Sequence, residues 1–93
     1  MEIFKFGGAS VKDAEGVKNL VSVLEATAEA DLVLVISAMG KTTNNLEVVV
    51  ANYFTNPSAI EASVHAVYTY HLSILSGLFS NTSHPVFTQL AAI

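Results

Sequence analysis

The chain has 93 residues, of which 52% are hydrophobic and only 13% are charged, and its net charge is −4. This length suits one domain. The negative charge argues against a nucleic-acid-binding protein, because phosphate contacts need clustered Lys and Arg. Without cysteine, disulfides and thiolate metal sites are excluded. Glu2, Lys5 and two glycines interrupt any apolar stretch of the secretory-signal kind, so a cytoplasmic location is expected.

Charge is concentrated in the first half of the chain. The four basic residues all lie within positions 1–41, and from Thr42 onward only Glu47 and Glu61 are charged. A small domain usually carries more charge on its surface. We therefore expect the apolar second half to be covered by further chain or by a second copy. A homo-oligomer formed through this half is the predicted assembly.

The first predicted element is a short strand over Glu2–Phe6, which Gly7-Gly8 stops. Apolar residues at helical spacing then predict a helix over residues 11–30, with Ser10 as its N-cap and Asp13 as the acid three positions later. Gly16 within this helix either marks close packing or is merely tolerated.

A continuous apolar run over residues 31–37 predicts a second strand, buried on both faces as in a parallel sheet. Strand, helix and strand together form a βαβ unit. Further helices are predicted over residues 45–54 with Asn44 as cap, over 57–79, and from His84 to the end. The fold class is α/β: the βαβ start of a parallel-sheet αβα sandwich followed by helices. Two strands leave two open edges, so the domain is expected to be incomplete.

The loop Lys5-Phe6-Gly7-Gly8-Ala9-Ser10 is a candidate phosphate site. It joins the carboxyl end of a strand to the start of a helix, where open α/β sheets bind ligands and where backbone N–H groups favour an anion. Glycines let the backbone approach a phosphate closely, and Lys5 supplies a positive charge. The alternative is a tight turn with a surface lysine.

A second polar loop, residues 37–44, follows the second strand. Its Gly40-Lys41-Thr42 resembles the end of a Walker A motif, but Val35 stands where the first glycine is required, so that motif is rejected. The hydroxyl groups of this loop suit a small polar substrate. Capping of the next helix by Thr43 or Asn44 explains them equally well.

Together the segments KFGGASV (5–11) and VISAMGKTTNNL (35–46) resemble the two opening signatures of aspartokinases, members of the amino-acid kinase family. The resemblance covers positions 1 to about 50. It implies transfer of the terminal phosphate of ATP, with Mg²⁺, to the β-carboxylate of L-aspartate, in the biosynthesis of lysine, threonine and methionine. By position, the resemblance implies that Lys5 contacts the phosphate and is catalytic. It implies that Gly7, Gly8 and Ser10 form the phosphate-facing loop. It implies that the hydroxyls of Ser37 and Thr43 bind the aspartate substrate.

Two departures from the family pattern stand out. Ala9 replaces the usual threonine, which removes a hydroxyl near the phosphates. Family enzymes are also several-fold longer, and their remaining catalytic residues and regulatory ACT domains are absent here. Residues 1–93 are therefore expected to be the N-terminal part of an amino-acid kinase domain, inactive alone and without a tightly bound cofactor. The alternative is a non-catalytic α/β oligomerisation or assembly module.

Neither a membrane span nor a metal site is expected in the second half. Residues 59–79 approach the length of a transmembrane helix, but Glu61, His65 and His71 interrupt them. Glu61 and His65 stand four residues apart and could share a helix face, yet no further ligands join them in the pattern. Ordinary core or surface side chains are the expected reading.

Overall fold

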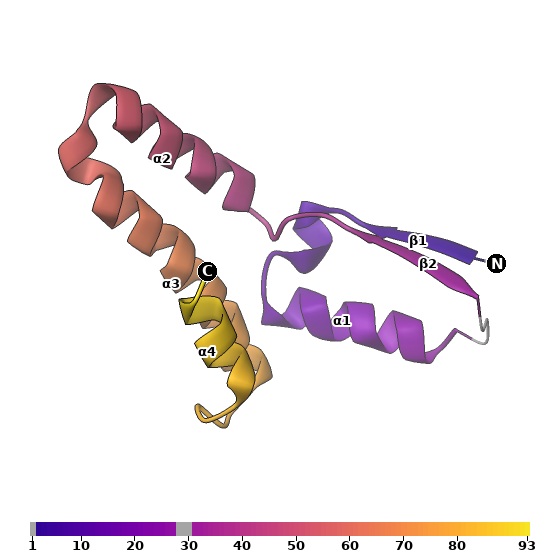
Figure 1. Ribbon diagram of the computed structural model, residues 1–93. Coiled ribbons are helices and arrows are strands. Elements are labelled where there is room, and N and C mark those ends of the chain that lie inside the picture. Colours follow the sequence, from indigo (N-terminus) through magenta and orange to yellow (C-terminus); the bar gives the residue numbers. More distant parts are fainter. Residues whose placement is uncertain (1, 28–30) are drawn as a thin grey trace. The chain divides into compact units, whose positions relative to one another are not determined.

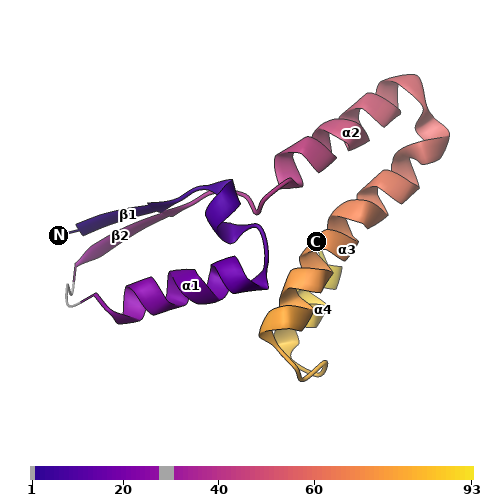
Figure 2. The same ribbon diagram turned by 180° about the vertical axis from the view of Figure 1, so that it is seen from behind.

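The computed structural model describes residues 2–27 and 31–93. The chain divides into two compact units, Met1–Lys41 and Thr42–Ile93. Figure 1 and Figure 2 show the elements of both units from opposite sides.

The first unit is a βαβ arrangement. Strand β1 (Glu2–Phe6) pairs in parallel with strand β2 (Leu32–Ile36), and the register sets Glu2 opposite Leu32 and Phe6 opposite Ile36. Helix α1 (Ala14–Glu25) lies alongside this two-stranded sheet in both views (Figure 1 and Figure 2). The predicted strand–helix–strand order and the α/β class are confirmed.

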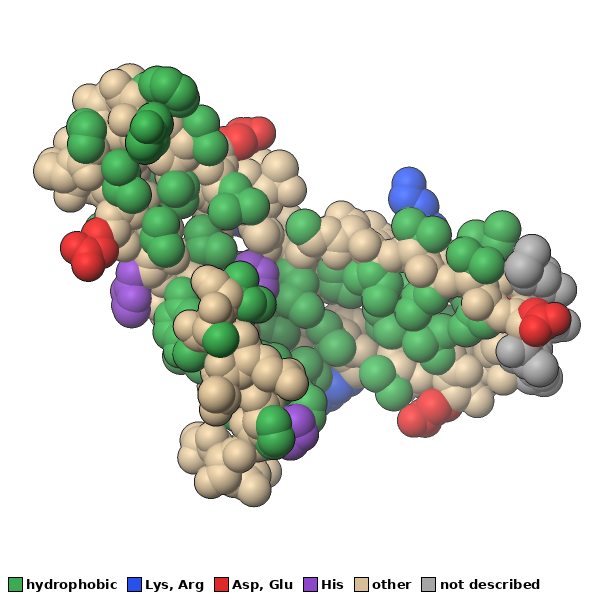
Figure 3. Space-filling model, viewed as in Figure 1, with side chains coloured by type: hydrophobic (Ala, Val, Ile, Leu, Met, Phe, Trp, Pro, Cys, Tyr) green, Lys and Arg blue, Asp and Glu red, His purple; other side chains and the backbone are tan. Residues whose placement is uncertain are grey.

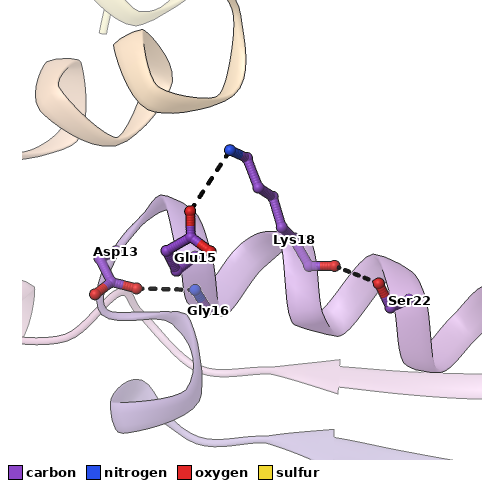
Figure 4. A network of polar contacts seen from close by, with 5 residues as sticks. All are labelled: Asp13, Glu15, Gly16, Lys18 and Ser22. Atoms are coloured by element: carbon purple, nitrogen blue, oxygen red, sulfur yellow. Dashed lines mark hydrogen bonds and ion pairs between the residues drawn. The ribbon is translucent and has the colours of Figure 1, made fainter.

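The start of α1 differs from the prediction. A short 3-10 helix, η1 (Gly8–Val11), precedes it, and the Ser10 N–H donates to the Gly7 carbonyl at 3.0 Å. Asp13 is the N-cap, since its Oδ1 accepts from the Gly16 N–H at 2.8 Å (Figure 4). Ser10 as the cap is thus wrong: the chain makes a 3-10 turn at Ser10, and the acid three residues on satisfies the first-turn donor instead.

Gly16 marks close packing. A Cβ at this position would collide with the carbonyl group of Ser10, so the backbone of η1 approaches α1 as closely as a glycine allows. At the other end, α1 stops at Glu25, and the Ala26 N–H bonds to the Ser22 carbonyl. The predicted extension of the helix reaches residues 28–30, which lie outside the described residues.

The sequence predicted that strand β2 is buried on both faces, and this prediction is wrong. Its side chains from Val33 to Ile36 are 41%, 37%, 46% and 51% exposed. Burial of both faces needs a layer on each side of a sheet, and α1 is the helix that lies along this sheet in the described residues. The apolar strand therefore keeps much of its surface exposed.

The second unit is helical. It contains α2 (Thr42–Thr55), the 3-10 turn η2 (Pro57–Ala59), α3 (Ile60–Leu78) and α4 (Pro85–Ala91). The predicted helices are confirmed with one correction: α2 begins at Thr42, so Asn44 lies in its first turn and is not its cap. His84 caps α4, because its Nδ1 accepts from the Val86 N–H at 3.1 Å.

Helices α2 and α3 pack together, and α4 packs on α3. The side chain of Ile74 on α3 is 3% exposed and forms the buried centre of this unit. Apolar side chains also lie widely over the visible surface (Figure 3), and α2 exposes many of them: Leu46, Val48, Val50, Tyr53 and Phe54.

Within residues 2–27 and 31–93, no helix combines the length and apolar character needed to cross a bilayer. The same residues contain no group of three or more His, Asp or Glu side chains placed to hold a metal ion.

Candidate functional site

The two predicted site loops meet at the carboxyl ends of β1 and β2. The Ser37 N–H donates to the Phe6 carbonyl at 3.0 Å and so extends the strand pairing by one residue. Farther along both loops, two residues beyond β1 and four beyond β2, the Gly40 N–H donates to the Gly8 carbonyl at 3.1 Å. The loops are therefore joined by main-chain atoms, at the edge of the sheet where α/β proteins bind their ligands.

Gly8 is required by this close approach. A Cβ at Gly8 would lie 3.3 Å from the carbonyl oxygens of both Ala38 and Gly40, tighter than most real Cβ contacts. Gly7 is different, because a Cβ there would meet nothing within 4 Å and its backbone is extended, with φ −76° and ψ 172°. Of the two adjacent glycines, only Gly8 is needed by the neighbouring loop.

Positive φ occurs at Gly40, not at the glycine pair. Gly40 has φ 46°, the left-handed region that favours glycine, and among the described residues it is the glycine with this conformation. From the sequence, Gly40 was considered as part of a rejected Walker A motif and of the segment 35–46 that resembles an aspartokinase signature, but no conformational role was assigned to it. A glycine between an apolar strand and the start of a helix indicates a turn, and this signal could have identified Gly40 as the residue with positive φ.

Lys5 is exposed and lies one residue before the end of β1, opposite Val35. The rings of Phe4 and Phe6, 6.5 Å apart, mark one face of this strand. Because side chains alternate along a strand, Lys5 projects from the opposite face. Ser10 is also exposed, and since its N–H already bonds Gly7, its hydroxyl is the group left to contact a ligand.

The two predicted substrate hydroxyls belong to different units. Ser37 is exposed in the first unit, and its Oγ donates only a long 3.3 Å hydrogen bond to the Ala38 carbonyl. Thr43 is the exposed second residue of α2 in the second unit. The first unit thus gathers the loops that carry Gly7, Gly8, Ser10 and Ser37, with Lys5 on the adjoining strand.

Sequence reasoning missed one polar contact beside this motif. Thr42 is 9% exposed, and its Oγ1 lies 3.1 Å from Nε2 of His71 on α3. The two residues are 29 positions apart, so no local pattern connects them.

Two curated proteins of Arabidopsis thaliana are similar to the chain. Aspartokinase 1, chloroplastic, is 44% identical over 63 residues, which cover 63% of this chain and 11% of the relative. Aspartokinase 2, chloroplastic, is 34% identical over 95 residues, which cover 98% of this chain and 16% of the relative. No family model and no solved structure matches the chain.

The second of these alignments extends through nearly the whole chain, so the similarity includes the helical unit as well as the two loops. The chain spans about one sixth or less of the length of the relatives it matches. Together with a parallel βαβ unit whose loops meet as described, these alignments lead to one conclusion: the chain is related in sequence to aspartokinases.

Proposed function

We propose that this chain supplies the phosphate-facing loop and the aspartate-facing hydroxyls of an aspartate kinase of the amino-acid kinase family. The reaction transfers the terminal phosphate of MgATP to the β-carboxylate of L-aspartate, as in lysine biosynthesis. One observation carries the proposal: the Gly40 N–H bonds the Gly8 carbonyl, which joins the two motif loops at the carboxyl ends of parallel strands. The sequence similarity to two aspartokinases supports it independently.

Each residue has a role that its chemistry suits. Lys5 is exposed at the end of β1 and provides a charge for the transferring phosphoryl group, the step in which electrostatic stabilisation matters most. Gly7 and Gly8 keep the backbone open to the phosphates, and the Ser10 hydroxyl donates to them. Ser37 and Thr43 hydrogen-bond aspartate.

These 93 residues are expected to lack turnover by themselves. Phosphoryl transfer depends on many groups that position and neutralise the phosphates, and the chain spans only 11% and 16% of the two aspartokinases it matches. A coupled assay with MgATP and L-aspartate is expected to detect no ADP above background. Robust turnover by the purified chain would contradict this expectation.

Binding tests the site more directly than turnover. Calorimetric titration with MgATP is expected to show binding that Lys5→Ala weakens about tenfold to a hundredfold, because a charge-assisted hydrogen bond is worth about 1.5–3 kcal/mol. Lys18→Ala is the matched control, since Lys18 lies on α1 and its ammonium group is 3.7 Å from Glu15 (Figure 4). Equal effects of the two substitutions, or no binding by the unsubstituted chain, would remove the phosphate site.

A second candidate function is a homo-oligomeric assembly module. The supporting observation is the exposed apolar surface of α2, where the side chains of Val50, Tyr53 and Phe54 are 57%, 66% and 76% exposed. Light scattering after size-exclusion chromatography is expected to show association at micromolar concentration, which Phe54→Ser weakens. A clean monomer would leave this surface without such a role.

The cellular location also stays a prediction. We expect a cytoplasmic location, whereas the two similar aspartokinases are named as chloroplastic. Imaging of the tagged full-length gene product in its own cells distinguishes the two compartments.

A further inference from the structure

Thr42 is a polar side chain buried at the start of a helix. It is the first residue of α2 and is 9% exposed, and its Oγ1 lies 3.1 Å from Nε2 of His71. His71 in turn places its Nδ1 2.8 Å from the Val67 carbonyl, one turn earlier on α3. Two consecutive hydrogen bonds of the His71 ring therefore connect the backbone of α3 to the first turn of α2.

The direction of each hydrogen bond follows from its acceptor. A carbonyl oxygen only accepts, so Nδ1 of His71 carries the proton that it donates to Val67. In the neutral ring Nε2 is then an acceptor, and the Thr42 hydroxyl donates to it. The hydrogen bond to the Val67 carbonyl thus fixes the tautomer of His71 in which Nε2 can accept a hydrogen bond from the Thr42 hydroxyl.

The next residue of α2 faces the other way. Consecutive side chains of an α-helix diverge by about 100°, and Thr43 is exposed where Thr42 is buried. One hydroxyl of the adjacent pair is used to hold the helix, and the other is open to solvent. Whatever fixes Thr42 also fixes the direction in which Thr43 points.

We infer that His71 is a positioning residue, which anchors the first turn of α2 through Thr42 and thereby orients the Thr43 hydroxyl toward L-aspartate. The inference rests on the proposed function for its substrate. Its structural part, the anchor, concerns contacts within the second unit alone. A first helical turn is otherwise prone to fraying, because its leading N–H groups have no partner within the helix.

Amide hydrogen exchange tests the anchor. By helix geometry the Leu46 N–H donates to the Thr42 carbonyl, at the start of α2. His71→Phe and Thr42→Val are each expected to speed exchange at Leu46 about fivefold to tenfold, the factor that corresponds to one net hydrogen bond. The double variant is expected to show less than the sum of the two single effects, because the two changes share one interaction. Thr42→Ser is expected to behave as the unsubstituted chain.

The matched control is Thr55→Val, since the Thr55 hydroxyl donates to the Ala51 carbonyl at the far end of the same helix. It is expected to leave Leu46 unchanged. Unchanged exchange at Leu46 in His71→Phe, or additive effects in the double variant, would overturn the anchor.

An NMR titration with L-aspartate, in the presence of MgATP, tests the orientation. The Thr43 amide resonance is expected to shift on addition of aspartate, with an apparent Kd about fivefold to tenfold higher in His71→Phe and unchanged in Thr55→Val. If aspartate shifts Thr43 equally in the unsubstituted chain and in His71→Phe, the inference is wrong and the proposed function stands. If Thr43 responds in neither, the aspartate part of the proposed function fails, and the orienting role of His71 falls with it.

Discussion

The contacts that join the site loops within the first unit differ in kind from those that hold the start of α2 within the second unit. In the first unit Val11 and Leu20 are buried, and the two loops of the candidate site are joined by main-chain groups: the β1–β2 ladder, its extension at Ser37, and the bond from Gly40 to Gly8. In the second unit the contacts are between side chains, with Ile74 buried and Thr42 bonded to His71. The difference teaches where substitutions should act, since backbone contacts are disturbed by adding atoms and side-chain contacts by removing them.

The largest expected effect is the loss of the buried side chain of the second unit. Ile74→Ala removes a side chain that is 3% exposed, and large-to-small core substitutions of this type lower the free energy of unfolding by about 2–5 kcal/mol. Val64→Ala on the same helix is the control, because Val64 is 49% exposed. Urea unfolding followed by circular dichroism compares them. Equal losses would show that α3 has no buried centre.

Gly16→Ala tests close packing in the first unit. A glycine-to-alanine change within a helix usually raises stability, whereas here it is expected to lower stability. Helix propensity alone would raise stability by about 1 kcal/mol. The collision of the new Cβ with the Ser10 carbonyl is instead expected to lower the free energy of unfolding by about 2–3 kcal/mol, in the range of overpacked sites. Differential scanning calorimetry gives the sign directly, and a higher Tm would disprove the close approach.

The adjacent glycines offer a paired test of the loop contact. Gly8→Ala places a Cβ 3.3 Å from two carbonyl oxygens and is expected to destabilise the unit by about 1–2 kcal/mol. Gly7→Ala meets nothing within 4 Å and is expected to be nearly neutral. The Gly40 amide, whose exchange rate reports the bond to Gly8, should exchange faster only in Gly8→Ala. Equal behaviour of the two variants would contradict the loop geometry.

The smallest expected effect concerns the cap of α1. Asp13→Ala removes the carboxylate that accepts from the Gly16 N–H and is expected to cost about 1 kcal/mol of stability. Ser10→Ala is expected to change stability much less, because Ser10 lies in η1 and does not cap α1. Thermal unfolding of both variants ranks them, and the reverse order would restore Ser10 as the cap.

The sequence predicted the order of elements well, because each depends on local patterns. The apolar runs of β1 and β2, and the Asn56-Pro57 and His84-Pro85 pairs that open the later helices, are read within a few residues. The errors at Ser10 and Asn44 are shifts of two or three positions, where several capping residues compete.

The site was predictable only in part, for a physical reason. The two loops could be placed at one sheet edge from strand direction alone, but the bond between Gly8 and Gly40 depends on how far each loop continues beyond its strand. The contact between Thr42 and His71 spans 29 residues and depends on how α2 packs against α3. Neither of these two contacts can be recognised from a short sequence motif.

The main-chain bond between Gly8 and Gly40 has a consequence for how this site can change over evolution. Since the bond between Gly8 and Gly40 joins main-chain atoms, positions 9 and 38 are available for substitution without loss of the shared geometry. The alanine at position 9 is one such variation. A library restricted to these two positions should therefore return many folded chains that differ in ligand preference, whereas a library at Gly8 and Gly40 should return very few.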